Sequence, residues 1–299
     1  MTTDVQAVLQ GWSAPVGLDV ALVCAALLYA RGWFRLRSAS ATLIPPWRLA
    51  SFLMGIASVW LAIGSPLEAF DELLLTVHMT QHLLLMAIAP PLILLGAPTL
   101  PLLQGLSQFL ARKVVGPFLR WRVVKWLGHA ITNPAICWFA ATISLIVWHI
   151  PAVFDLALRS DSLHKFEHIC FFATGLLFWW PVVQPWPSVA RWPRWSIPLY
   201  LFCATLPCDV LSGFLAFCDR VVYSAYLSAP RIVGMSPLQD QQCAAAVMWV
   251  AVTIIFLIPA IVVTVHILSP QKNHPAQDSF AELNRIVGQP LDPSSVKTV

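Results

Sequence analysis

Seven apolar stretches, each about as long as a membrane-spanning helix, follow one another along this chain and end at residue 268. Lipid cannot hydrogen-bond to a peptide group, so a chain crosses a bilayer only as helices or as a closed barrel. Hydrophobic residues make up 58% of the sequence and charged residues 11%, a balance that excludes an ordinary soluble core. The stretches cover residues 18–34, 48–64, 73–96, 134–150, 163–183, 197–217 and 242–268. We therefore expect an all-α fold, a polytopic membrane helix bundle of about seven transmembrane helices, with residues 1–268 forming one domain.

Lysine and arginine are distributed unevenly between alternate connections. Of the 18 basic residues, 14 lie in the first, third and fifth connections and in the tail; the other side holds only Arg159, Lys165, Arg220 and Arg231. Cytoplasmic connections of membrane proteins carry the excess of basic residues, so we expect the amino terminus outside and the carboxyl terminus in the cytoplasm. Residues 269–299 are polar and contain prolines but no apolar period, and we expect a disordered cytoplasmic tail there.

Charge and cysteine content exclude several classes of function. The net charge of +4 is not gathered into a basic patch, so nucleic acid is not an expected partner. The seven cysteines are an odd number and form no C-x-x-C pair. They predict neither a disulfide framework nor a covalent haem attachment site.

Five of the eight histidines fall on the outer side once this orientation is imposed. His78 and His82 open the third stretch, His149 ends the fourth, and His164 and His168 open the fifth. Within each pair the spacing is i, i+4, which places both imidazoles on one helix face, close enough to share one metal ion. The alternative is that each histidine only hydrogen-bonds to a neighbouring helix. Because five buried imidazoles would then need five separate partners, we favour a shared metal site.

Residues beside the histidines suggest the identity of the metal and how the ligands are oriented. Thioether sulfur favours Cu(I), so Met79 and Met86 indicate copper if they point inward, although methionine in an apolar helix usually serves packing. Glu167, beside His168, either accepts a hydrogen bond from the second nitrogen of a histidine ligand or simply faces the lipid headgroups. Asp71 and Glu68, in the short connection before the third stretch, offer a route for cations or are simply solvated.

Three further polar residues lie in the outer half of later stretches. Asp209 is an intramembrane carboxylate, which marks a candidate functional residue by default, and Cys208 beside it is either a soft ligand or a small packing residue. Asp240 lies at the outer interface near the start of the last stretch. It either belongs to a path for protons or metal ions or caps the amino end of its own helix.

The sequence resembles the polytopic CtaG family of cytochrome c oxidase assembly factors, and the resemblance extends from the third stretch to the seventh. The matching elements are His78-Met79-Thr80-Gln81-His82, Ala89-Pro90-Pro91-Leu92, Gly96-Ala97-Pro98, Trp148-His149-Ile150-Pro151, His164 with Glu167-His168, Phe178-Trp179-Trp180-Pro181, and Asp240-Gln241. The resemblance implies a non-enzymatic, multi-pass protein of the bacterial plasma membrane that helps to assemble a haem-copper oxidase by supplying copper. Its partners would be oxidase subunits or copper chaperones. Cys208 and Asp209 lie outside the matching elements.

Two other classes of function remain open on the sequence alone. His164-Lys165-Phe166-Glu167-His168 fits the pattern H-x-x-E-H, in which two histidines hold zinc and the glutamate activates water, as in a zinc-dependent membrane hydrolase. Opposed histidines on two helices can also hold a haem iron from both sides, as in a haem-binding membrane electron carrier. The haem reading needs one histidine per helix, whereas this chain offers pairs.

Overall fold

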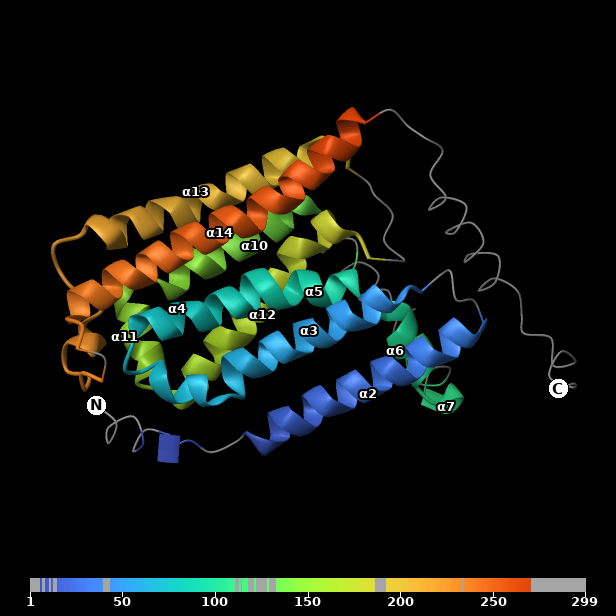
Figure 1. Cartoon of the computed structure of the whole chain (residues 1–299), viewed down its shortest axis with the longest axis horizontal. Coiled ribbons are helices and arrows are strands. Elements are labelled where there is room, and N and C mark those ends of the chain that lie inside the picture. The colour runs from blue at the N-terminus through green and yellow to red at the C-terminus, as the bar shows by residue number, and fades with distance from the viewer. Residues whose placement is uncertain are drawn as a thin grey trace, which may run out of the picture.

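The protein is a bundle of long helices that run nearly parallel or antiparallel to one another (Figure 1). The structure, a computed structural model, describes residues 15–39, 44–110, 133–185, 192–232 and 234–269, with a few isolated positions elsewhere. Those residues contain helices and turns but no strand. The long helices are α2 (Val16–Ala39), α3 (Pro46–Ile63), α10 (Pro134–Trp148), α12 (Asp161–Val183), α13 (Ser196–Phe217) and α14 (Pro237–Leu268).

The predicted number of membrane helices is confirmed as six to seven. Six helical spans are long and apolar enough to cross a bilayer, and a seventh is obtained if α10 and the short α11 (Pro151–Leu158) count as one span. A bend of 75° separates α10 from α11, at His149 and Ile150. Pro151 cannot donate an amide hydrogen, so α10 ends before it and the chain turns across the end of the bundle. Of the predicted tail, residues 269–299, all but Ser269 lie outside the described residues.

The third span is the centre of the bundle and is built from three pieces. It consists of α4 (Leu75–Leu83), one wide turn of π-helix, η2 (Leu84–Ile88), and α5 (Ala89–Leu95). The carbonyl of Met86 has no donor four or five residues further on, because Pro90 and Pro91 lack amide hydrogens. The indole Nε1 of Trp179, on α12, donates to this carbonyl over 3.1 Å. α12 is therefore tied to the third span where the regular helix is interrupted.

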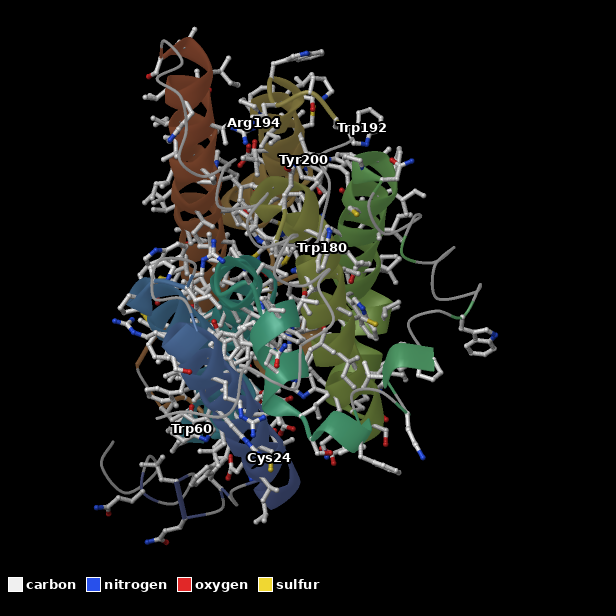
Figure 2. All side chains as sticks on the ribbon, turned by 90° about the vertical axis from the view of Figure 1, so that its right-hand side faces the viewer. Cys24, Trp60, Trp180, Trp192, Arg194 and Tyr200 are labelled. Carbon is white, nitrogen blue, oxygen red and sulfur yellow. The ribbon has the colours of Figure 1, made fainter. Side chains whose placement is uncertain are left out.

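Glycine lets α12 approach this wide turn closely. A Cβ atom on Gly175 of α12 would lie 2.8 Å from both the Cα and the carbonyl oxygen of Met86. The other long helices surround the same span: α3 packs on α5, and α14 packs on α4 (Figure 1). In Figure 2, which is turned by 90° from Figure 1, Cys24 of α2 lies at the edge of the bundle. The third span is therefore shielded on several sides, which suits it to carry polar side chains.

The last helix begins earlier than the sequence predicted. The apolar stretch was expected to start at residue 242, whereas α14 starts at Pro237. Ser236 forms a capping box: its hydroxyl accepts from the amide of Gln239, and the Gln239 side chain accepts from the amide of Ser236. The expectation that Asp240 caps its own helix is therefore wrong. The capping signal, Ser-Pro-Leu-Gln, lies in the polar residues just before the apolar run.

Candidate metal centre

The amino end of α4 is held by a carboxylate from α14. Asp240, which is only 4% exposed, accepts hydrogen bonds from the amides of Leu75 (2.6 Å) and Thr76 (3.2 Å) and from the Thr76 hydroxyl (2.6 Å). Two of the amide donors that a helix leaves unpaired at its start are satisfied in this way, and the negative charge suits the positive end of the helix dipole. The contact fixes the first turn of α4, directly before His78.

His78 and His82 lie one turn apart on the buried face of α4. Their side chains are 0% and 4% exposed, and their ring centroids lie 4.3 Å apart. His78 also stacks on His164 of α12, with centroids 5.2 Å apart and an angle of 13° between the rings. The predicted i, i+4 face of α4 is therefore confirmed, and it meets α12.

The second pair, on α12, faces the first. The rings of His164 and His168 lie 4.3 Å apart, and the ring of His168 lies 5.8 Å from that of His82. Glu167, on the same helix, is fully buried, and its Oε1 lies 3.5 Å from Nε2 of His82 and 4.0 Å from Nε2 of His78. Four of the five predicted histidines therefore meet in one cluster, and Glu167 belongs to it through His78 and His82.

Asp71 adds a second carboxylate at the outer edge of this cluster. Its Oδ2 lies 3.7 Å from Nε2 of His164, and the side chain of His164 is 13% exposed, the most open of the four imidazoles. Burial raises the pKa of Asp71 to about 7, and the carboxylates of Glu72 and Glu68 contribute to the rise. Asp71 lies in the connection that was expected to offer a route for cations, and it reaches the cluster itself.

The donor atoms are arranged as ligands of a metal ion would be. Two sets of ligand atoms lie within 4.8 Å of one another: Asp71, His78 and His164, and His78, His82 and Glu167. His78 belongs to both sets. The separations of 3.5 and 4.0 Å exceed a hydrogen bond of about 2.7–3.2 Å. They match two atoms that share a metal at about 2.0–2.2 Å each, since such atoms lie about 3 to 4 Å apart.

Many polar atoms in the cluster have no hydrogen-bond partner. They are both ring nitrogens of His78 and His82, Nε2 of His164 and His168, Oδ2 of Asp71, and both carboxylate oxygens of Glu167. Each unpaired buried polar group costs about 1–3 kcal/mol. The alternative that each histidine merely bonds a neighbouring helix therefore does not describe these four imidazoles, and the donor set fits a cation.

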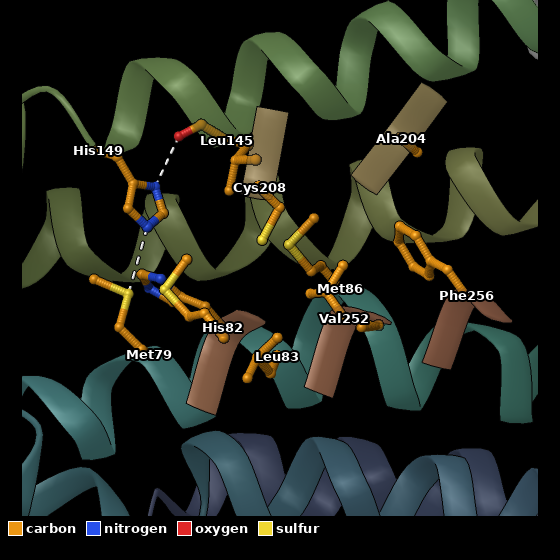
Figure 3. A pocket seen from close by; sticks show the side chains of 12 residues that line it. Met79, His82, Leu83, Met86, Leu145, His149, Ala204, Cys208, Val252 and Phe256 are labelled. Carbon is orange, nitrogen blue, oxygen red and sulfur yellow. Dashed lines mark hydrogen bonds between the residues drawn. The ribbon is translucent and has the colours of Figure 1, made fainter. Parts of the chain in front are cut away.

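His149 lies apart from the four-histidine cluster. His149 directly follows the last residue of α10; its Nδ1 lies 2.7 Å from the carbonyl of Leu145, and its Nε2 lies 3.4 Å from the sulfur of Met79 (Figure 3). Its ring is 6.1 Å from that of His82. His149 thus faces a thioether on the neighbouring face of α4 and belongs to neither ligand set.

The remaining predicted site residues are placed in different surroundings. Cys208 is buried and lines a small cavity beside Met79 and His149, and its sulfur lies 3.8 Å from the Ser212 hydroxyl. Asp209, the next residue, is half-buried and is in neither ligand set. Asp240 caps α4, as described above.

Two fully buried glutamines were not singled out from the sequence. Gln81 donates to the carbonyl of Ala62 on α3, and Gln241 accepts from the amide of Val222 and donates to the carbonyl of Leu215. Both lie next to predicted residues, in His78-Met79-Thr80-Gln81-His82 and in Asp240-Gln241. A polar side chain within an apolar stretch could have marked both glutamines in the sequence. Each of them hydrogen-bonds to backbone groups of neighbouring segments near the cluster.

Two mycobacterial proteins are among the relatives that are similar in sequence to this chain. An uncharacterised protein of Mycobacterium leprae is 26% identical over 249 residues, which are 81% of this chain and 36% of the relative. An uncharacterised protein of Mycobacterium tuberculosis is 28% identical over 250 residues, 81% of this chain and 37% of the relative. The chain thus spans little more than a third of the length of these relatives.

The family comparison covers most of the bundle. No solved structure gives a significant match to the chain. The family model described as cytochrome c oxidase caa3 assembly factor matches residues 27–269, a range that begins within α2 and extends through α14. That range includes both histidine pairs, Glu167 and the capping carboxylate of Asp240. The chain therefore belongs to the cytochrome c oxidase caa3 assembly factor family.

Proposed function

We propose that this protein assists cytochrome c oxidase assembly by binding a transition-metal ion, with copper as the favoured cargo, in the cluster of His78, His82, His164, His168 and Glu167. Membership of the assembly factor family supports the first part. The second part rests on one observation: imidazole and carboxylate atoms from α4 and α12 converge in the protein interior without hydrogen-bond partners. A bound cation would satisfy those atoms and offset the cost of burying them.

The donor set favours certain metals. Imidazole nitrogen suits copper and zinc alike, whereas a site for magnesium or calcium would be built from oxygen ligands. The thioether of Met79 lies outside this cluster and faces His149, and soft sulfur next to the cluster favours copper over zinc as the ion that the protein handles. In this proposal His78, His82 and Glu167 hold the ion, and Asp71 with His164 receives it from the outer side. Copper is the cargo of the protein, and no reaction is assigned to it.

We infer that the cluster faces the outside of a bacterial plasma membrane. It lies at the end of the bundle where α2 begins and where α11 crosses, whereas α14 ends at the opposite end (Figure 1). Arg35, Arg37 and Arg48 lie at that opposite end, as does Arg194 (Figure 2) just before α13. An excess of basic residues favours the cytoplasmic side. Copper chaperones and oxidase subunits outside the membrane would then be the expected partners.

The two competing functions fit the geometry less well. A hydrolase of the H-x-x-E-H type would use Glu167 with His164 and His168, but the carboxylate of Glu167 lies next to His78 and His82 on α4. A haem between the helices would need a flat slot. The imidazoles instead lie against one another, with centroids 4.3–5.8 Å apart.

Metal analysis of the detergent-purified protein tests the proposal. We expect near-stoichiometric copper after copper loading, no Soret band, and at least a tenfold loss of affinity in His82→Ala and Glu167→Gln. The matched control is His266→Ala, since His266 is exposed near the end of α14 and should leave binding unchanged. Circular dichroism verifies that each variant is folded. In cells, His82→Ala should lower the amount of assembled oxidase. Equal metal content in wild type, His82→Ala and Glu167→Gln would overturn the proposal.

A further inference from the structure

A cavity of about 40 Å³ lies against the four-histidine cluster, on the side of α4 that faces α10, α13 and α14. His82 belongs to both, because its ring lines the cavity while its Nε2 lies 3.5 Å from Glu167. The volume is enough for one small ion or one water molecule. Its chemistry differs from that of the cluster. The lining side chains with a nitrogen or sulfur atom that can bind a metal are Met79, His82, Met86, His149 and Cys208 (Figure 3), together with Met248.

His149 and Met79 are already spaced as two ligands of one metal. Nδ1 of His149 lies 2.7 Å from the carbonyl of Leu145, which can only accept, so Nδ1 carries the proton. In the neutral imidazole, Nε2 then holds a lone pair, and the sulfur of Met79 lies 3.4 Å from this nitrogen. Metal bonds of about 2.0 Å to nitrogen and about 2.3 Å to sulfur, at a tetrahedral angle, place those atoms about 3.5 Å apart. Two acceptor atoms at this distance suit a cation that binds both.

Sulfur is concentrated at this cavity. Three of the six methionines of the chain line it, from α4, η2 and α14, and Cys208 adds a thiol from α13. Figure 3 shows the sulfur atoms of Met86 and Cys208 turned into the same space. Methionine usually fills gaps in an apolar core. Here the sulfur of Met79 lies 3.4 Å from Nε2 of His149, and packing alone does not account for that contact.

We propose that this cavity is a second metal site, specific for Cu(I), formed by His149, Met79, Cys208 and Met86. Thioether, thiolate and imidazole together are soft ligands that select Cu(I), whereas the cluster of imidazole and carboxylate suits divalent ions. Cys208 would lose its proton when it binds, and the metal keeps its oxidation state. The inference deepens the proposed function, on which it rests for the idea that copper is the cargo. His82 then lies between a site that prefers Cu(I) and a cluster that prefers divalent ions.

The experiment is an anaerobic titration of the detergent-purified full-length protein with Cu(I) against a colorimetric Cu(I) chelator. X-ray absorption spectra of the loaded protein accompany it. We expect sulfur in the coordination shell of wild type. Met79→Leu combined with Cys208→Ala should weaken Cu(I) binding at least tenfold and remove the sulfur signal. The matched control is Met54→Leu with Cys24→Ala, which replaces an exposed methionine and an exposed cysteine outside the cavity.

Binding of Zn²⁺ as a divalent probe separates the two proposals. Met79→Leu with Cys208→Ala should keep Zn²⁺ binding, and Glu167→Gln should weaken Zn²⁺ binding while the sulfur signal of Cu(I) persists. A wild-type Cu(I) spectrum with nitrogen and oxygen ligands only would overturn the second site, whether or not the variants fold. If Zn²⁺ binding were insensitive to Glu167→Gln while Cu(I) still bound sulfur, the cluster would fail and the second site would stand.

Discussion

Replacing Asp240 tests whether one helix positions the ligands of another. In Asp240→Ala the first turn of α4 loses its cap, which costs about 1 kcal/mol. The Leu75 amide, buried and 2.6 Å from the lost oxygen, is left without a partner at a further cost of about 1–3 kcal/mol. We therefore expect a total loss of stability of about 2–4 kcal/mol. Asp240→Asn keeps one accepting oxygen and should lose about 1–2 kcal/mol.

The assay is equilibrium unfolding in mixed micelles, followed by circular dichroism, together with metal titration of the folded variant. Since His78 lies one turn from the cap, fraying of α4 should also lower the affinity of the cluster for metal. The control is Asp219→Ala, which removes an exposed carboxylate just after α13 and should change neither quantity. If Asp240→Ala were as stable as wild type and bound metal equally well, the role of this contact would be refuted.

Three further predictions concern packing and ligand binding. Gly175→Ala should destabilise the protein by about 1–3 kcal/mol, because the new Cβ would meet the backbone of Met86. Gly213→Ala, where a Cβ would enter open space, should leave stability unchanged, and thermal unfolding compares the two variants. Trp179→Phe removes the donor to the Met86 carbonyl and should cost about 1–3 kcal/mol in the same assay, more than Trp60→Phe, whose indole bonds to an exposed carboxylate. Free metal at a hundred times its Kd should stabilise the protein by about 2.7 kcal/mol, an effect that a chelator reverses.

The sequence was sufficient for the spans because a bilayer imposes a minimum apolar length on every crossing helix. It was also sufficient to predict that each histidine pair shares a helix face, since residues i and i+4 of a helix lie on the same side. Helix ends were predicted less well. The start of α14 depended on a capping box in a polar segment, and α10 proved too short to be a straight span because the chain bends at His149.

Contacts between helices were beyond the sequence. His149 was grouped with the four other histidines by depth alone, and only the direction in which α10 presents its ring shows that it faces Met79. Met248 lines the same cavity from α14, far along the chain, with no local signal to mark it. Asp240 lies near the start of α14, and its position in the sequence suggested that it caps that helix. The structure shows that it caps α4 instead, a contact that the sequence alone does not reveal.

The order of synthesis gives the Trp179 contact a further meaning. A ribosome delivers the third span to the membrane well before α12 has been made, and at that stage the Met86 carbonyl has no donor and the amides at the start of α4 lack Asp240. During synthesis the third span therefore has unpaired polar backbone groups, which gain their partners only when α12 and α14 are inserted. Those two helices should stabilise the third span, so truncated chains that end before Trp179 are expected to be retained by chaperones or degraded.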